Sequence, residues 1–337
     1  GEIILSQQLE EAVHARLEAK EQVILLLNRR GFAPVVLCPS CAWVAACEHC
    51  QVSLTFHTQV GVLRCHYCNA EYPQDGACPE CKTTPLLFLG SGTQKAEDYL
   101  ARTFRGARIA RMDADSTQRK GGHARILSAF AAGETDLLIG TQMLAKGHDY
   151  PGVTLVGVVN ADRGLTLPDF RAAESGFQLL CQVAGRAGRG AQRGEVLIQT
   201  YRPRHYAIQA AAQHDYHAFY TAEIAQREAA GFPPFRRLAH FMLEAPDPQE
   251  AERNAVLLRR IAREQRDALG LHGIEIMGPA PAIIRQIQGR YRWTLGLLSN
   301  SPKRLNALVR GIRPAFEEAR SSSRVALKVD FDPVNSL

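Results

Sequence analysis

Four Cys-x-x-Cys pairs within residues 38–81 constrain this chain more than any other feature of its sequence. The pairs are Cys38/Cys41, Cys47/Cys50, Cys65/Cys68 and Cys78/Cys81. Eight thiols at this spacing supply two tetrahedral sites of four cysteines, and Zn²⁺ is the usual ion in such sites. Four disulfides in a secreted domain fit less well, because no signal peptide opens the sequence and the cysteines fill one short insert of a long chain. We therefore expect two structural zinc ions.

The lengths of the connecting segments indicate which pairs share an ion. Residues 42–46 separate the first pair from the second, residues 69–77 the third from the fourth, and the longer segment 51–64 the second from the third. Because a zinc ribbon joins its hooks by about 15 to 20 residues, the spacing favours a nested arrangement, although pairing in sequential order stays open. The inner site then comprises Cys47, Cys50, Cys65 and Cys68, and the outer site comprises Cys38, Cys41, Cys78 and Cys81.

Three histidines, His49, His57 and His66, lie near these cysteines in the sequence. Because eight thiols already fill both sites, no ligand position is left for an imidazole. We therefore expect all three histidines at the surface.

Composition places the chain among ordinary soluble proteins and leaves its partners open. It has 337 residues, of which 46% are hydrophobic and 22% charged, a length that suits about two or three domains. No apolar run approaches the roughly 20 residues of a membrane-spanning helix. Eight thiolates add eight negative charges and two Zn²⁺ add four positive charges, so the formal net charge of +6 becomes +2. Metal-bound thiols predict a cytoplasmic protein, and the ninth cysteine, Cys181, is expected to be a buried thiol.

Strands and helices alternate before residue 203, outside the cysteine-rich insert. Strands are expected at residues 23–27, 33–37, 108–111, 136–139, 154–159 and 195–199, and helices near residues 7–19, 94–103, 124–131 and 170–184. This alternation predicts a parallel, doubly wound α/β sheet, and fully apolar runs suit strands that are covered on both faces. The expected domain comprises residues 1–37 and 82–203, interrupted by the insert at residues 38–81.

A different pattern follows a helical linker at residues 204–235. Beyond the sequence GFPP we expect a strand, a helix, two strands, a helix and a strand, at residues 238–243, 249–268, 274–278, 292–298, 302–319 and 325–331. This β-α-β-β-α-β order is the ferredoxin-like plan. Residues 236–337 are therefore expected to form a separate domain.

A hairpin of this last domain carries a basic and aromatic cluster. The cluster consists of Arg285, Arg290, Tyr291, Arg292 and Trp293. Arginines interleaved with aromatic residues suit phosphate contacts and base stacking, so the pattern predicts DNA binding here. A solvated hairpin with Trp293 packed inward is the alternative.

Two loops of the predicted α/β domain carry candidate phosphate-binding residues. The first, GTQMLAKGHD at residues 140–149, combines small residues with Thr141, Gln142 and Lys146. The second, QVAGRAGRG at residues 182–190, places Arg186 and Arg189 three residues apart, hence on one face if the segment is helical. Loops beyond the carboxyl ends of parallel strands carry function in open α/β sheets, and paired guanidiniums can clamp a phosphoryl group.

Together these sequences resemble a known family. GTQMLAKGHD is similar to motif five and QVAGRAGR to motif six of superfamily-two helicases, and NRRGF, GSGTQKAED, RMDADST and VDFDP narrow the match. With the four hooks, the chain resembles the C-terminal half of the primosomal protein N′ family of replication-restart helicases. The resemblance implies a second RecA-like helicase lobe, a double-zinc cysteine-rich insert and a C-terminal DNA-binding domain, and its zinc arrangement is nested.

The resemblance also implies roles for single residues. Arg186 and Arg189 match the arginines that reach ATP held by a first lobe, and the nucleotide cleft would include Gln182, Gly147 and Asp149. The loop with Thr141, Gln142 and Lys146 would couple nucleotide state to contacts with the DNA backbone. Asp162 matches a family aspartate whose role stays open.

The sequence lacks two motifs of a complete helicase. It contains no G-x-x-x-x-G-K-[ST] phosphate loop and no DExH motif, so ATP and Mg²⁺ are expected to bind only together with a first lobe. The family implies an ATP-dependent 3′→5′ DNA helicase that binds stalled or branched forks and restarts replication by primosome assembly. A zinc-containing scaffold without a motor, which binds forks and recruits replication partners, is the alternative.

Partners and the role of the insert follow from the same resemblance. It implies forked DNA, single-strand-binding protein and other primosomal proteins as partners of a monomeric, cytoplasmic, nucleoid-associated protein. The insert can be purely structural, since so short a segment folds around its metal, or it can serve as a platform for strand separation and partner binding.

Overall fold

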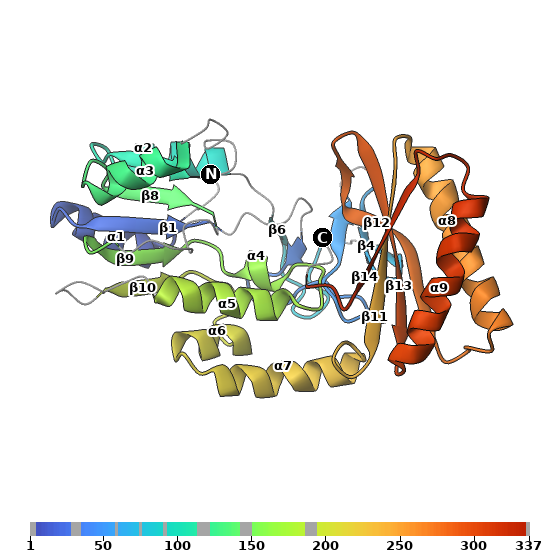
Figure 1. Ribbon diagram of the computed structural model, residues 1–337. Coiled ribbons are helices and arrows are strands. Elements are labelled where there is room, and N and C mark those ends of the chain that lie inside the picture. Colours follow the sequence, from blue (N-terminus) through green and yellow to red (C-terminus); the bar gives the residue numbers. More distant parts are fainter. Residues whose placement is uncertain are drawn as a thin grey trace. The chain divides into compact units, whose positions relative to one another are not determined.

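The computed structural model describes residues 5–27, 35–57, 60–73, 76–89, 93–112, 122–141, 150–185 and 194–334. The chain forms two compact units (Figure 1). The first unit comprises Gly1–Arg30, Ser91–Leu165 and Ala173–Tyr220, and the second comprises Gly31–Gly90, Thr166–Ala172 and Thr221–Leu337. None of the helices in the described residues is long and apolar enough to cross a membrane.

A parallel five-stranded sheet is the centre of the first unit, in the order β10-β9-β1-β8-β7 (Figure 1). Its strands are β1 (Gln22–Leu26), β7 (Ile109–Met112), β8 (Leu137–Gly140), β9 (Val153–Val158) and β10 (Glu195–Ile198). Successive residues point to opposite faces, so Val23 and Leu25 enter one core while Ile24 and Leu26 enter another. Burial on both faces explains why these strands read as continuous apolar runs.

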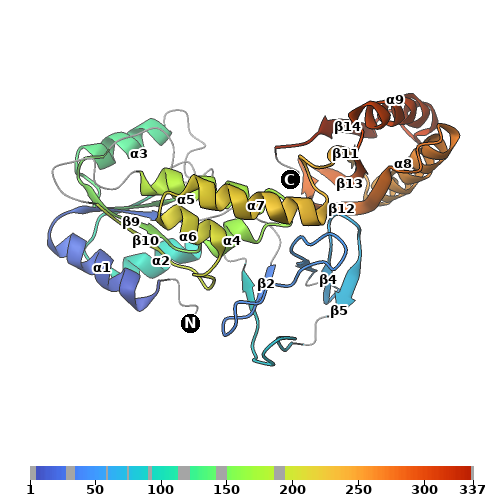
Figure 2. The ribbon, with the colours of Figure 1, turned by 90° about the horizontal axis from the view of Figure 1, so that it is seen from below.

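Helices cover both faces of this sheet (Figure 2). α1 (Gln7–Glu18) and α2 (Thr93–Thr103) lie on one face; α3 (Gly122–Ala131), α5 (Ala172–Ala184) and α6 (Tyr206–Ala212) lie on the other. The short α4 (Asp162–Leu165) follows β9, and α7 (Tyr216–Ala230) follows α6. The predicted doubly wound lobe is therefore confirmed.

Two antiparallel sheets form the second unit. The smaller sheet has the order β5-β4-β3-β2-β6 and belongs to the cysteine-rich segment, residues 35–89, which we call the zinc module. The larger sheet has the order β12-β13-β11-β14. The smaller sheet contains β2 (Val35–Leu37), β3 (Thr55–His57), β4 (Val62–Arg64), β5 (Glu71–Pro73) and β6 (Leu87–Leu89). Since β2 and β6 pair with each other here, both belong to the module's sheet, and the exact domain boundaries stay a prediction.

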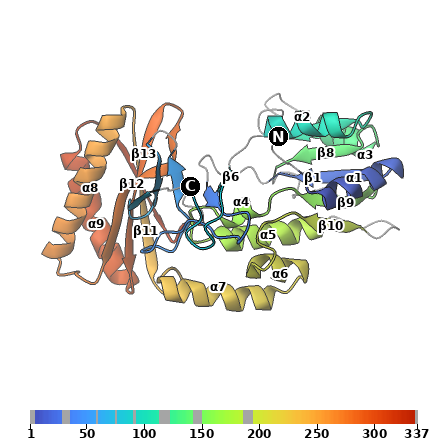
Figure 3. The same cartoon turned by 180° about the vertical axis from the view of Figure 1, so that it is seen from behind.

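The larger sheet has the strand order and the helices of a ferredoxin-like domain, as predicted. It contains β11 (Arg237–Ala245), β12 (Glu275–Ile287), β13 (Arg290–Ser299) and β14 (Ala326–Phe331), with α8 (Pro248–Ala268) and α9 (Pro302–Ala319). Both helices begin at a side-chain cap, Asp247 for α8 and Ser301 for α9, followed by proline in the first turn. The helices cover one face of the sheet, and the zinc module covers the other (Figure 3).

Candidate metal centres and motif residues

All four Cys-x-x-Cys hooks have the same backbone geometry. The carbonyl oxygen of each first cysteine accepts a hydrogen bond, at 2.8 to 3.0 Å, from the amide of the residue after the second cysteine. That residue has a positive φ in every hook although none is glycine: Ala42 (62°), Gln51 (53°), Asn69 (66°) and Lys82 (60°). Residues other than asparagine and glycine rarely adopt this conformation, so its fourfold repetition reflects a constraint that all four hooks share.

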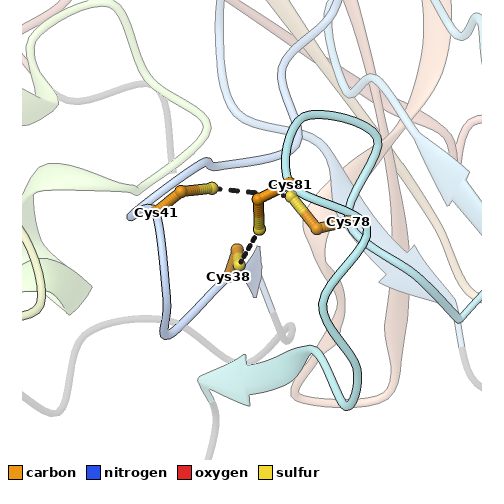
Figure 4. A group of neighbouring side chains, drawn as sticks. All are labelled: Cys38, Cys41, Cys78 and Cys81. Atoms are coloured by element: carbon orange, nitrogen blue, oxygen red, sulfur yellow. Dashed lines mark hydrogen bonds between the residues drawn. The ribbon is translucent and has the colours of Figure 1, made fainter.

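The hooks assemble into two sulfur tetrads. Cys38, Cys41, Cys78 and Cys81 form one, drawn in Figure 4, and Cys47, Cys50, Cys65 and Cys68 form the other. Within each tetrad the ligand atoms lie within 4.8 Å of one another. The grouping is the nested one that the segment lengths favour, with the outer tetrad at the base of the module.

The sulfur spacing fits zinc. A tetrahedral ion with Zn–S bonds of about 2.3 Å requires sulfur atoms roughly 3.8 Å apart. The Sγ atoms of Cys38 and Cys81 are 3.5 Å apart, and the Cys41–Cys78 and Cys47–Cys68 distances are both 3.6 Å. The two tetrads therefore match the predicted pair of structural zinc ions in donor chemistry and in geometry.

The two tetrads have different surroundings. In the outer one Cys41 and Cys81 are exposed; in the inner one three thiols are buried and Cys68 is half-buried. The hydroxyl of Tyr72 lies 3.5 Å from the Sγ of Cys47 and can donate to it when that sulfur is a thiolate. Such donors outside the ligand shell orient a metal ligand and stabilise its charge.

One histidine of the module lies in the interior, so the expectation of three surface histidines is wrong for His66. Its side chain is 4% exposed, and its Nδ1 lies 2.6 Å from the carbonyl oxygen of Pro281 in β12. Because a carbonyl only accepts, Nδ1 carries the proton. Burial lowers the pKa of His66 to about 4. His49 is exposed and His57 is partly exposed.

The backbone on either side of His66 also contacts the larger sheet. The hydroxyl of Thr294 donates to the carbonyl oxygen of His66 at 3.3 Å. A Cβ placed on Gly278 would lie 3.2 Å from the carbonyl oxygen of Tyr67, so glycine permits this close approach. The module and the C-terminal domain thus share polar contacts as well as one apolar core.

An aromatic stack in the same unit involves the short segment Thr166–Ala172. The rings of Phe170 and Phe232 are parallel within 8° with centroids 5.0 Å apart, and Tyr67 meets Phe232 edge-on at 5.8 Å. The guanidinium carbon of Arg227 lies 5.4 Å from the centre of the Phe170 ring. This stack anchors the segment between α4 and α5 to the second unit.

The residues predicted in the two phosphate-binding loops fall mostly outside the described residues. This holds for Gln142, Lys146, Gly147, Asp149, Arg186 and Arg189. Thr141 directly follows β8, and its amide donates to the carbonyl oxygen of Met112 at 3.4 Å. Gln182 lies exposed on α5. Thr141 is therefore at the carboxyl end of a sheet strand, where the sequence pattern places it.

Asp162, whose role the sequence left open, has a structural one here. Its carboxylate is fully buried and accepts hydrogen bonds from the Thr200 hydroxyl at 2.9 Å and the Tyr201 amide at 2.8 Å. Burial raises the pKa of Asp162. These bonds fasten the segment after β10 to the start of α4.

The hairpin cluster does not lie on one face. Tyr291 and Trp293 pack against the core under α8 and α9, and the alternating Arg292 is 7% exposed on the opposite face. Arg290 donates to the carbonyl oxygens of Glu244 and Arg324, at 2.9 and 2.6 Å. The period-two alternation of a strand is the sequence signal for this arrangement, because successive side chains of a strand point to opposite faces of the sheet.

Glu244 is the acidic partner that organises this end of the hairpin. Its carboxylate lies 3.7 Å from the Nε of Arg292, 3.8 Å from that of Arg290 and 3.0 Å from the Nζ of Lys328. By contrast, Arg285 is exposed, and its guanidinium lies 3.2 Å from the Nδ1 of His57. Of the three predicted arginines, Arg285 is exposed, Arg290 is partly exposed and Arg292 is buried.

Comparison with known proteins agrees with these features. The family model described as the primosomal protein N C-terminal domain matches residues 228–334, the PriA DNA helicase Cys-rich region domain matches residues 47–73, and the helicase conserved C-terminal domain matches residues 81–191.

The replication restart protein PriA of Bacillus subtilis is 41% identical over 98% of this chain and 40% of its own length. Those of Synechocystis sp. and Haemophilus influenzae are 43% and 41% identical, over 98% of this chain and 39% and 44% of their own lengths. The chain thus spans less than half the length of these relatives. It belongs to the family of the replication restart protein PriA, of which it carries the helicase C-terminal, cysteine-rich and C-terminal domains.

Proposed function

We propose that this chain acts as the C-terminal half of an ATP-dependent 3′→5′ DNA helicase that binds stalled or branched replication forks and restarts replication by primosome assembly. One observation carries the proposal: a helicase C-terminal lobe and two domains matched by PriA models occur in one chain. The names of the relatives support the same function.

The lobe contributes arginines and a nucleotide-cleft surface in this proposal. Arg186 and Arg189 follow α5 in the sequence and reach ATP held with Mg²⁺ by a first lobe, while Gln182, Gly147 and Asp149 belong to the cleft. A guanidinium stabilises the charge that develops on a transferring phosphoryl group. Such an arginine acts only where another lobe supplies the phosphates.

DNA contacts are assigned to two places. Thr141, Gln142 and Lys146 follow β8 and bind the DNA backbone, since small polar residues and a lysine suit phosphate contact. In the C-terminal domain, Arg285 is best placed for a phosphate, because it is exposed beside the hairpin turn. The other predicted DNA contacts, Arg290, Tyr291, Arg292 and Trp293, make contacts within the domain itself.

The zinc module serves as a rigid platform in this proposal. Its two metal sites supply the stability that a segment of its length lacks, and its buried contacts with the C-terminal domain hold it in place. Primosomal proteins and single-strand-binding protein are the proposed partners of a monomeric, nucleoid-associated protein.

The decisive experiment measures DNA-dependent ATP hydrolysis by the full-length parent, with Arg186→Ala beside Arg102→Ala as the control. Arg102 is an exposed arginine of α2, so its loss removes the same charge elsewhere. We expect loss of about 10³-fold or more in turnover for Arg186→Ala alone, the range for removal of an arginine finger. Absence of turnover in the unmodified parent, with fork binding retained, would instead favour a scaffold without a motor.

The DNA contact is tested separately by the salt dependence of fork binding. Arg285→Ala should reduce the slope of log K against log salt by about one unit, because one phosphate contact is lost. Arg292→Ala, which removes a buried arginine of the same hairpin, should leave the slope unchanged. Equal slopes for Arg285→Ala and the unmodified chain would remove Arg285 from the footprint.

A further inference from the structure

The outer tetrad has two cysteines exposed to solvent, whereas no cysteine of the inner tetrad is exposed. Cys41 and Cys81 are exposed, and they come from different hooks. Each lies next to a buried thiol of the other hook: Cys41 is 3.6 Å from Cys78, and Cys81 is 3.5 Å from Cys38 (Figure 4). The outer tetrad therefore contains two pairs that join an accessible sulfur to a shielded one.

The inner tetrad is covered by the C-terminal domain. Cys47, Cys50 and Cys65 are buried in the cluster that also contains Phe232 and Met277. A cavity of about 280 Å³ borders Cys50 and Cys68, which makes these two the inner thiols that a small molecule can approach. Cys50 is nonetheless buried and Cys68 is half-buried, so neither is as exposed as Cys41 or Cys81.

We propose that the outer tetrad is an oxidation site, which a peroxide converts to a disulfide between the two hooks while the inner tetrad keeps its metal. Reactivity of cysteine toward peroxide follows thiolate character and exposure. Both tetrads supply thiolates as zinc ligands, so exposure is the property that separates them. The proposal is independent of the helicase function.

The chemistry balances with a hydroperoxide as the oxidant. The exposed thiolate, Cys41 or Cys81, attacks one peroxide oxygen; an S–O bond forms, the O–O bond breaks and the leaving hydroxide takes up a proton. The neighbouring thiolate, Cys78 or Cys38, then attacks this sulfenic sulfur, and the S–S bond forms as the S–O bond breaks; the second hydroxide leaves and also takes up a proton from solvent. Two sulfurs lose one electron each, and hydrogen peroxide becomes two waters. The two thiolates that remain are too few for a tetrahedral zinc site.

The position of the outer tetrad gives this oxidation a consequence. Cys38 directly follows β2, and β2 pairs antiparallel with β6 through Val35–Leu89, Val36–Phe88 and Leu37–Leu87. These two strands are the paths by which the chain enters and leaves the module. Oxidation would replace a four-ligand clamp at this pair by a single covalent link and leave the inner site in contact with the C-terminal domain.

The test uses the zinc-loaded chain and increasing amounts of hydrogen peroxide. Released zinc is measured with a colorimetric chelator, and the remaining thiols are alkylated and mapped by mass spectrometry. We expect loss of one equivalent of zinc together with a Cys41–Cys78 or Cys38–Cys81 disulfide, with the four inner cysteines still reduced. A reductant with added zinc should restore the second equivalent.

Three results would overturn the proposal: oxidation of the inner cysteines first, loss of both equivalents together, or no loss of zinc. A variant with Cys41→His and Cys81→His provides a second measurement, because a Cys₂His₂ set still binds zinc without an exposed thiol. This variant should retain both equivalents under peroxide, and release like that of the unmodified chain would contradict the assignment. If the variant fails to fold, the disulfide map of the unmodified chain decides.

Discussion

The imidazole of His66 donates a hydrogen bond from Nδ1 to the carbonyl oxygen of Pro281 at 2.6 Å, joining an inner zinc hook to β12 of the C-terminal domain. Because His66 lies between Cys65 and Cys68, this bond places a metal-binding turn and a sheet strand in one fixed arrangement. The zinc module and the C-terminal domain therefore share one compact unit in which the metal site stabilises an interdomain surface.

Loss of this imidazole should destabilise the second unit. We expect His66→Ala to lower the free energy of unfolding by about 2–3 kcal/mol, because a buried carbonyl loses its donor and a cavity remains. His66→Asn should recover part of the loss, since its amide offers a donor near the position of Nδ1. Urea unfolding of zinc-loaded protein measures the effect, with the exposed His49→Ala as the control. Equal stability of His66→Ala and the unmodified chain would contradict a docking role.

Alanine substitutions at Gly278 and Gly289 distinguish the stability cost of close packing from that of backbone strain. Both have positive φ, 86° and 75°. A Cβ on Gly278 would lie 3.1 to 3.2 Å from backbone atoms of Ala280, Thr294 and Tyr67, whereas one on Gly289 meets none of the described atoms within 4 Å. Gly289→Ala should cost about 1–2 kcal/mol from strain, and Gly278→Ala a further 1–3 kcal/mol, roughly, from overpacking. Chemical denaturation of both variants measures the difference, and equal costs would exclude a tight module contact.

The left-handed residue of a zinc hook should influence metal retention. Ala42 has a φ of 62° directly after Cys41, a conformation that a β-branched residue tolerates poorly. Ala42→Val should weaken zinc retention at the outer tetrad by about tenfold, equivalent to about 1.4 kcal/mol, whereas Ala42→Gly should retain zinc at least as well. Competition with a chelator measures retention. Ala46→Val, at an exposed residue with ordinary φ, is the control, and a loss there equal to that of Ala42→Val would refute the strain argument.

The stability of the first unit should depend on pH through His205. This residue caps α6 by accepting a hydrogen bond at Nδ1 from the amide of Ala207 at 3.2 Å, and burial lowers its pKa to about 4. Between its unfolded pKa of about 6.5 and this value, the unfolded chain binds the proton and the folded chain does not. The contribution of His205 to stability is therefore present above pH 6.5 or so and is lost as the pH falls toward 4.

His205→Asn isolates this effect, because asparagine also caps a helix but does not titrate. As the pH falls from 7.5 to 4, the unmodified chain should lose up to about 3 kcal/mol of stability relative to His205→Asn. This is the loss expected for a pKa displaced by about 2.5 units. Unfolding by urea at several pH values measures it. A difference that does not change with pH would show that His205 is not held neutral.

Local patterns in the sequence predicted most elements of the α/β lobe and of the C-terminal domain, but not the strands β3, β4 and β5 of the zinc module. The continuous apolar runs around Ile24 and Val156 predict strands buried on both faces. The helix capped by Asp247 is visible in its proline and acidic first turn. These signals are local because each depends on residues within a few positions of one another. The order of elements after residue 236 then indicates a ferredoxin-like sheet, which the strand order confirms.

The residues whose burial the sequence did not predict depend on contacts between distant segments. His66 looks like a surface residue of a metal hook, yet it is buried because β12 lies over it, more than 200 residues later in the chain. Arg292, predicted as a nucleic-acid contact, is 7% exposed and lies 3.7 Å from the carboxylate of Glu244 on a neighbouring strand. No local pattern reports which face of a strand another segment will cover.

By itself, the sequence determined that eight cysteines form four metal hooks and that a parallel α/β lobe precedes an antiparallel C-terminal domain. Only the tertiary structure decided that the inner tetrad packs against this domain while Cys41 and Cys81 of the outer tetrad stay exposed. The physical reason is that hook spacing and strand periodicity are set by neighbouring residues. Burial, by contrast, depends on which apolar surfaces of the folded chain meet, and that is a property of the whole unit.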